Sequence, residues 1–195
     1  MELQGYVQIY HGEDSGLIQL FDYLHVIENF TISLWYTKWC IGAHEHPREL
    51  RTSLDHLKYM CLYHLILDGD HHYGMPILAL LFRASPNLEK IKLRIFPPYI
   101  IEESDVGEDY SDIQLKNLTE LEIEDFGNME PELELVKFML IKSPMLKTLR
   151  IFINGNVEED EEPEMLNILL SYPRASPMVK ISLHRFELGP YRCNW

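Results

Sequence analysis

Two short segments hold most of the side chains that could bind a metal ion in this sequence. They are His44-Glu45-His46 and the run DGDHH from Asp68 to His72. Zinc accepts imidazole and carboxylate ligands, but neither segment has the HExxH spacing that places two histidines on one face of a helix. A zinc-binding histidine also needs a fixed hydrogen-bond partner behind it. Solvated loop side chains account for both segments, so we expect no metal and no other cofactor.

A catalytic cysteine is the other chemistry that the sequence could support. A thiol nucleophile needs a base within hydrogen-bond reach. His64 follows Cys61 by three residues, and in a regular strand this odd separation places the two side chains on opposite faces. The motifs G-x-S-x-G, G-x-x-x-x-G-K-[ST] and G-x-G-x-x-G do not occur in the sequence, and each would indicate a known type of site. We expect Cys61 to be a surface or interface residue and the protein not to be an enzyme.

The elements that would position these residues follow a repeated phrase. The phrase is L-x-x-L-x-L, with other apolar residues allowed, and its copies start 28 to 32 residues apart. The copies are Ile27-Phe30-Ile32, Leu57-Met60-Leu62, Leu88-Ile91-Leu93, Leu118-Leu121-Ile123, Leu146-Leu149-Ile151 and Met178-Ile181-Leu183. A nearly constant period of this length indicates stacked structural repeats, and this phrase is typical of leucine-rich repeats.

A helix is predicted between successive copies of the phrase. Pro131 opens an apolar, helically periodic stretch that ends at Ser143-Pro144, and Ser85-Pro86 and Ser176-Pro177 stand before two other copies. Proline ends a helix and favours extended geometry in the preceding residue. We therefore predict an α/β fold: a short leucine-rich-repeat solenoid of about six irregular repeats, with a curved parallel sheet on one face and helices on the other. An ordinary doubly wound α/β domain is the alternative. Counted from Ser176-Pro177, the strand of the last copy begins one residue earlier than the strands that follow the other two Ser-Pro pairs.

Further elements are predicted outside that stretch. We expect helices over residues 17–24, 75–83 and 165–170, a loop over 37–56 and an edge strand over 6–10.

The composition is that of a globular protein with a continuous core. Of the 195 residues, 46% are hydrophobic, and the net charge is −14. This charge argues against binding to nucleic acid or to anionic membranes, because both require basic surfaces. No apolar run is long enough to span a bilayer, and no secretory signal is visible at the N-terminus. Three widely spaced cysteines favour a reducing compartment, so we expect an intracellular protein of the cytoplasm, the nucleus or both.

Five longer phrases occur in a recognisable order. They are LFDYLHVIENFTISLW at 20–35, TSLDHLKYMCLYHLILDGD at 52–70, RASPNLEKIKL at 83–93, LTELEIEDFGNMEPELELVKFMLIKSPMLKTLRIFIN at 118–154 and EMLNILLSYPRASPMVKISL at 164–183. In this order they resemble the C-terminal half of plant F-box proteins that have leucine-rich repeats and an FBD domain. The resemblance implies degenerate repeats over 1–110, an FBD domain over 111–185 that continues the same solenoid, and a tail over 186–195.

The same resemblance implies a role in protein interaction. Members of this family recognise protein substrates for an SCF-type ubiquitin ligase, to which an F-box joins them through a Skp1-type adaptor. Residues 1–26 do not resemble an F-box, so we expect this adaptor as a partner only if an F-box lies upstream. The alternative is an adaptor-free binding protein, a decoy or a truncated gene product. In either case the expected partner is a protein whose identity the sequence does not give.

Strand alternation predicts which side chains face away from the helices. One strand presents three basic residues and the next presents three acidic ones. Parallel neighbours lie about 4.8 Å apart, so we predict a charge ladder with the pairs Lys90–Glu120, Lys92–Glu122 and Arg94–Glu124, and with Arg150 beside Glu122. A charged partner could bind such a strip. The ladder could instead only fix which strand lies beside which, and we favour this second interpretation because paired charges are costly to desolvate at an interface.

The N-terminal end of the sheet is therefore the predicted binding hot spot. Trp35, Tyr59 and Tyr63 are expected on adjacent strands of the exposed face, with Cys61 between the two tyrosines. Tyrosine and tryptophan dominate the hot spots of protein interfaces. The alternative is that the preceding loop covers these side chains.

Overall fold

The structure, a computed structural model, describes residues 5–7, 26–34, 50, 52–67, 74–96 and 110–185. Within these ranges the chain alternates strands with helices. In chain order the elements are β1 (Gly5–Val7), β2 (Asn29–Ser33), β3 (Tyr59–Leu65), α3 (Gly74–Ala84), β4 (Lys90–Ile95), β5 (Glu120–Phe126), α4 (Glu130–Lys142), β6 (Thr148–Ile153), α5 (Glu162–Ser171) and β7 (Lys180–Arg185).

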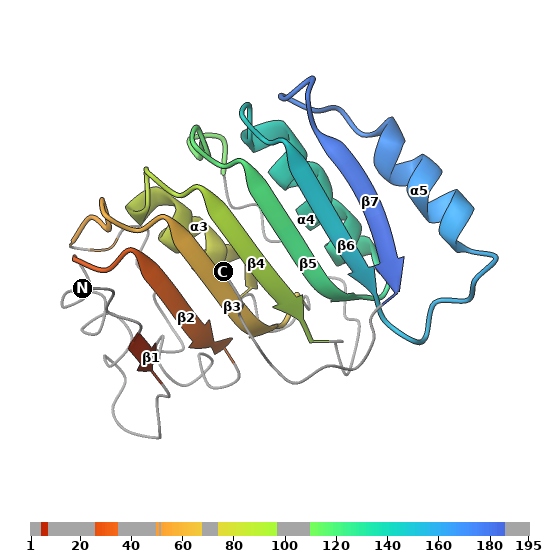
Figure 1. The fold of residues 1–195 in the computed structure, drawn as a ribbon, viewed down its shortest axis with the longest axis horizontal. Coiled ribbons are helices and arrows are strands. Elements are labelled where there is room, and N and C mark those ends of the chain that lie inside the picture. The colour runs from red at the N-terminus through yellow and green to blue at the C-terminus, as the bar shows by residue number, and fades with distance from the viewer. Residues whose placement is uncertain are drawn as a thin grey trace.

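The strands form one sheet in which spatial order follows chain order from β1 to β7. Every neighbouring pair is parallel. In Figure 1, α3 and α4 lie behind the sheet on the same face, and α5 lies beside β7 at the end of the row. The predicted α/β architecture with parallel strands is therefore confirmed. The helix predicted over 17–24 lies outside the described residues, whereas those predicted over 75–83 and 165–170 correspond to α3 and α5.

The repeated phrase supplies the core between sheet and helices. Its second and third apolar positions stand side by side on successive strands, so that Leu93 pairs with Ile123 and Ile123 with Ile151. All three side chains are completely buried. Burying one such side chain contributes about 1.5–3 kcal/mol, and stacking equivalent residues makes the core continuous along the row.

The residues before each strand form the same turn in repeat after repeat. The backbone N–H of Leu57, Leu88, Leu118 and Leu146 each donates to the carbonyl oxygen three residues earlier, at 3.0 to 3.3 Å. The last repeat has one residue fewer in this turn. Val179 is buried in place of the first leucine, while the predicted Met178 is 72% exposed. The strand itself keeps the predicted register, because Ile181 still pairs with Leu149.

Two strands have a bulge at the same point of the repeat. The register shifts between Leu62 and Leu65 on β3 and between Ile123 and Phe126 on β5. One residue in each bulge has a left-handed backbone, His64 with φ 56° and Asp125 with φ 59°. An inserted residue reverses the alternation of side chains along a strand, so these bulges change which residues reach the open face.

The acidic residue Glu132 fixes the entry into α4. Its Oε2 accepts hydrogen bonds from the backbone N–H groups of Gly127 at 2.8 Å and Met129 at 3.0 Å. Burial raises the pKa of this carboxyl, and the amides of Met129, Gly127 and Asn128 act in the opposite direction. A side chain at Gly127 would come within 2.9 Å of the Asn154 amide nitrogen, so the glycine allows the turn to pack closely. In the described part of the chain no helix has the length and hydropathy needed to cross a membrane.

Candidate functional site

The predicted charge ladder forms on the face of the sheet opposite α3 and α4. Lys90, Lys92 and Arg94 of β4 pair in register with Glu120, Glu122 and Glu124 of β5, respectively. Lys90 Nζ lies 2.9 Å from Glu120 Oε1, and Lys92 Nζ lies 2.8 Å from Glu122 Oε1. Arg150 of β6 approaches from the other side, with Nε 3.1 Å from Glu122 Oε2 and a nitrogen 3.5 Å from Glu120 Oε2.

The third rung of the ladder differs from the prediction. Arg94 Nε donates to Asp125 Oδ2 at 2.6 Å, and Glu124 Oε1 lies 2.6 Å from Lys92 Nζ. The bulge on β5 is the reason, because the left-handed backbone at Asp125 turns its carboxylate onto the ladder face next to Glu124. Lys92 thus bridges two carboxylates, and Arg94 binds a third that regular alternation would have placed on the opposite face.

The middle of the ladder is buried, which also differs from the prediction of an exposed strip. Lys92 and Arg94 are each 8% exposed and Glu124 is 9% exposed. Burial acts to lower the pKa of Lys92, but its hydrogen bonds with Glu122 and Glu124 outweigh this effect and raise it. The side chains of Lys90, Glu120 and Arg150, which lie outside this buried middle, are 28%, 29% and 31% exposed.

The bulge on β3 brings His64 to the same polar face, contrary to the expectation that it points the other way. His64 Nδ1 lies 2.9 Å from Ser33 Oγ of β2, just as Asp125 reaches Arg94 of the preceding strand. Both bonds link residues that are 31 positions apart. Burial and the nearby Arg94 guanidinium lower the pKa of His64, while the Asp125 carboxylate opposes them. The two bulges therefore place equivalent side chains so that each ties its strand to the one before it.

The predicted aromatic hot spot is only partly accessible. Tyr59 is half-buried, and Lys90 Nζ lies 5.6 Å from the centre of its ring. Tyr63 and Cys61 are 4% and 2% exposed, so the prediction that they are surface residues is wrong. Cys61 is also in a disulfide bond, which contradicts the expectation of reduced cysteines at this position. Trp35 lies outside the described residues.

The other end of the face has an aromatic pair that the sequence reasoning did not single out. Phe152 of β6 stacks on His184 of β7, with ring centroids 5.1 Å apart and an interplanar angle of 27°. Ser182 Oγ lies 2.9 Å from the Nε2 atom of the same imidazole. His184 is exposed, and Phe152 is half-buried. Strand alternation placed Phe152 on this face, and the register of β7 places His184 directly beside it.

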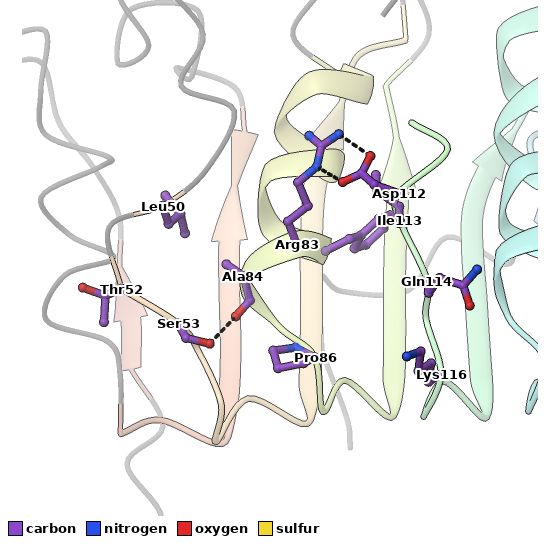
Figure 2. Close-up of a pocket in the computed structure, with 11 residues that line it drawn as sticks. Leu50, Thr52, Ser53, Arg83, Ala84, Pro86, Asp112, Ile113, Gln114 and Lys116 are labelled. Atoms are coloured by element: carbon purple, nitrogen blue, oxygen red, sulfur yellow. Dashed lines mark hydrogen bonds and ion pairs between the residues drawn. The ribbon is translucent and has the colours of Figure 1, made fainter. Parts of the chain in front are cut away.

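A pocket of about 610 Å³ lies at the C-terminal end of α3. It is bordered by the segments that precede β3 and β5. Figure 2 shows Arg83 reaching from α3 to Asp112, with Nε and a terminal nitrogen donating to the two carboxylate oxygens at 2.7 and 2.9 Å. This ion pair lowers the pKa of Asp112 to about 2. The described lining mixes apolar side chains with this pair, with the hydroxyls of Thr52 and Ser53 and with Lys116, and it includes no histidine or cysteine.

Both metal-binding candidates of the sequence, His44-Glu45-His46 and the DGDHH run, lie outside the described residues. Within the residues that are described, no group of three or more histidine, cysteine or acidic side chains could hold a metal ion.

Comparison with known proteins identifies the relatives of this chain. No protein-family model matches it, and no match was found among solved structures. A curated protein of Arabidopsis thaliana, described as an F-box/FBD/LRR-repeat protein, is 30% identical over 176 residues. The match covers 87% of this chain and 41% of the relative, so the chain spans less than half the length of that protein.

Proposed function

Because the chain is a relative of the plant F-box/FBD/LRR-repeat proteins, we propose that it is a protein-interaction module whose sheet face binds a partner protein. The observation behind this proposal is the row of parallel strands in chain order, with helices α3 and α4 on one face and polar side chains on the other. A face built from many short strands presents one row of side chains per repeat. Such extended surfaces are suited to binding other proteins.

The finer architecture that we propose is a short leucine-rich-repeat solenoid. Three observations support it. The phrase recurs with a nearly constant period, equivalent residues pair across successive strands, and the same hydrogen-bonded turn precedes four of the strands. We also propose that residues 111–185 are an FBD domain that continues this row, because the sheet passes from β4 to β5 without a change of register.

By its family, the module would recognise a substrate for an SCF-type ubiquitin ligase, with a Skp1-type adaptor as partner of the whole protein. The alternative is a binding protein or decoy without a ligase role. The relative's description names an F-box, which favours the first possibility.

The exposure of the side chains limits where on this face a partner can bind. Lys92, Arg94 and Glu124 are buried among one another. Removing the remaining water from these paired charges would contribute little to the free energy of binding. We propose that the contacts come from the half-buried aromatic residues on the two strands that flank the β4–β5 pair, Tyr59 of β3 and Phe152 of β6. An aromatic side chain that is half-exposed still has apolar area to bury against a partner.

Affinity purification of the chain from plant tissue, with quantitative mass spectrometry, tests this function. We would compare the wild type with Tyr59→Ala, Phe152→Ala and, as a control on the helix side, Lys137→Ala on α4. We expect specific proteins to be retained by the wild type and the control but lost with both face variants. Equal recovery with all four proteins would refute binding through this face. An adaptor and a cullin among the retained proteins would support the ligase role, and their absence beside a specific partner would support the alternative.

A further inference from the structure

The last strand of the sheet repeats the pattern of an inner strand. The sequence of β7 is KISLHR and that of β4 is KIKLRI. In both, a lysine comes first, isoleucine and leucine face the core at the second and fourth positions, and a basic residue or histidine stands at the fifth. Neither β7 nor its neighbour β6 contains an acidic residue.

The two strands differ in what lies beside them. The inner strand β4 is paired on both sides, and on its C-terminal side it meets ELEIEDF, the acidic strand β5. In the described part of the chain β7 pairs with β6 on one side and with no strand on the other. Exposure reflects this difference: Ile91 and Leu93 of β4 are completely buried, whereas Ile181 and Leu183 of β7 are only partly buried.

The charges on β7 are also incomplete. On β4, Lys90 and Lys92 each contact a carboxylate of the adjacent strand. Lys180, which holds the place of Lys90, is exposed and forms no ion pair among the described residues. Within the described ranges, β7 is therefore a basic and apolar strand that lacks the acidic neighbouring strand that β5 gives to β4.

We propose that the free side of β7 binds an extended segment of a partner protein as an added strand, in which acidic and apolar residues alternate as they do in β5. The main-chain hydrogen bonds would supply affinity, and the alternating side chains would supply selectivity. Acidic residues of the partner would meet Lys180 and His184, and its apolar residues would cover Ile181 and Leu183. Opposite charges directly across two strands are favourable, and like charges are unfavourable.

A second copy of this chain fits the edge less well. If two β7 strands paired with each other, Lys180 and His184 would meet no acidic residue of the other β7, because the strand has none. Arg185 is already paired with Glu162 of α5, at 2.7 Å. An exposed edge also risks unspecific pairing, and positive charge is one means by which proteins limit it. The lysine at the start of β7 thus disfavours self-association and favours an acidic partner.

The test is binding of a fluorescent peptide with the sequence ELEIEDF to the 195-residue chain, measured by anisotropy. We expect saturable binding that weakens about tenfold or more with Lys180→Glu, because a favourable pair becomes a repulsive one. Lys116→Glu, an exposed lysine on the segment before β5, is the charge-matched control and should bind as the wild type does. A peptide in which lysine replaces every acidic residue should not bind.

Two further peptides separate strand addition from simple charge attraction. In each, alternate backbone amides are N-methylated, in one phase or in the other. An added strand uses only one set of amides for the shared edge, so one peptide should bind and the other should not. Equal binding of the two, no saturable binding up to about 1 mM peptide, or an equal loss with Lys180→Glu and Lys116→Glu would overturn the proposal. Concentration-dependent self-association of the chain without peptide would assign the edge to a second copy and also overturn it.

This inference goes beyond the proposed sheet-face function and is tested separately from it. Tyr59→Ala reports on the face alone, because Phe152 also stacks on His184 of β7. Lys180→Glu and the methylated peptides report on the edge, so either proposal can fail while the other stands.

Discussion

Replacing Lys92 by methionine should destabilise the fold far more than the same change at Lys90, although both lysines pair with glutamates on the same face. Lys92 Nζ lies 2.8 and 2.6 Å from oxygens of Glu122 and Glu124, and the side chains of the three residues are 9%, 13% and 12% exposed. Methionine keeps most of the volume but removes the charge. Among the described residues Glu124 then has no other cation, while Glu122 keeps Arg150.

The expected loss of stability follows from the carboxylate that stays buried without a partner after the substitution. Removing one partner of a buried ion pair costs about 3–5 kcal/mol, because the remaining charge is buried without compensation. We expect about 3 kcal/mol for Lys92→Met, since one of the two carboxylates keeps a partner. The Lys90–Glu120 pair is 28% and 29% exposed, and exposed pairs contribute about 0–1 kcal/mol. We expect at most about 1 kcal/mol for Lys90→Met, including its contact with the Tyr59 ring.

Urea denaturation followed by circular dichroism measures both changes. With a slope of about 2 kcal/mol/M, the midpoint should fall by about 1.5 M for Lys92→Met and by about 0.5 M or less for Lys90→Met. The double variant Lys92→Met/Glu124→Leu should recover much of the loss, because it removes the charge that was left unpaired. Midpoints that agree within the error for the two single variants, or a double variant no more stable than Lys92→Met, would refute the reasoning.

Four further results are expected. Ser176→Ala should cost about 1 kcal/mol, because its buried hydroxyl donates to a backbone carbonyl at 2.6 Å. Ser143→Ala, which loses a buried hydroxyl that has no partner among the described residues, should be neutral or stabilising in urea titrations. Since the pKa of Asp112 is lowered from 3.8 to about 2, its pairing stabilises the fold above pH 3.8 and is lost as the pH falls toward 2, so thermal unfolding of Asp112→Asn should depend less on pH in that window. Burial raises the pKa of Glu132 above 4.5. The contribution of this raised pKa to the stability of the fold is therefore complete below pH 4.5 and is lost as the pH rises through the native pKa. Over this rise, Glu132→Gln should gain stability relative to the wild type. With Cys61 in a disulfide, a thiol titration of the unfolded chain should find one free thiol of three before reduction and three after it.

Strand register was predictable because it rests on a repeated and local pattern. The phrase fixes which residue of each strand enters the core, and a shift by one residue would turn the whole apolar set toward solvent. Once two strands are placed by that rule, their outward residues must meet in a determined order. Lys90 and Glu120 could therefore be paired from the sequence alone, and the structure places them 2.9 Å apart.

The bulges were not predictable from the same rule. Alternation assumes that each strand is regular, and one inserted residue reverses it for everything that follows. His64 and Asp125 are not glycines, and neither is marked by a turn sequence, so their left-handed backbones have no clear signal in the sequence. Once the structure is known, their position in the repeat can be recognised as a signal, because both residues follow the last apolar residue of the phrase by two places.

Burial on the open face was the other failure of the prediction. The inward positions of a strand are identified by their own residue types, but the exposure of an outward position depends on the neighbours above and beside it. Tyr63 and Cys61 were assigned to the surface from alternation alone, and both are buried. Such contacts join residues from distant parts of the chain, so they are determined by tertiary packing and not by strand period.

The ladder and the edge strand together indicate how this molecule uses charge. Between β4 and β5, basic and acidic side chains pair with each other, and the middle of the ladder is buried, which leaves these side chains little area for contact with a partner. At β7 the same basic and apolar pattern occurs without an acidic strand beside it, and Lys180 remains exposed. A pattern that selects one neighbour inside the sheet should select the same kind of neighbour at its edge, since the distances and hydrogen-bond directions are the same. The internal pair β4–β5 is therefore a template, within the chain itself, for the partner strand that we expect β7 to accept.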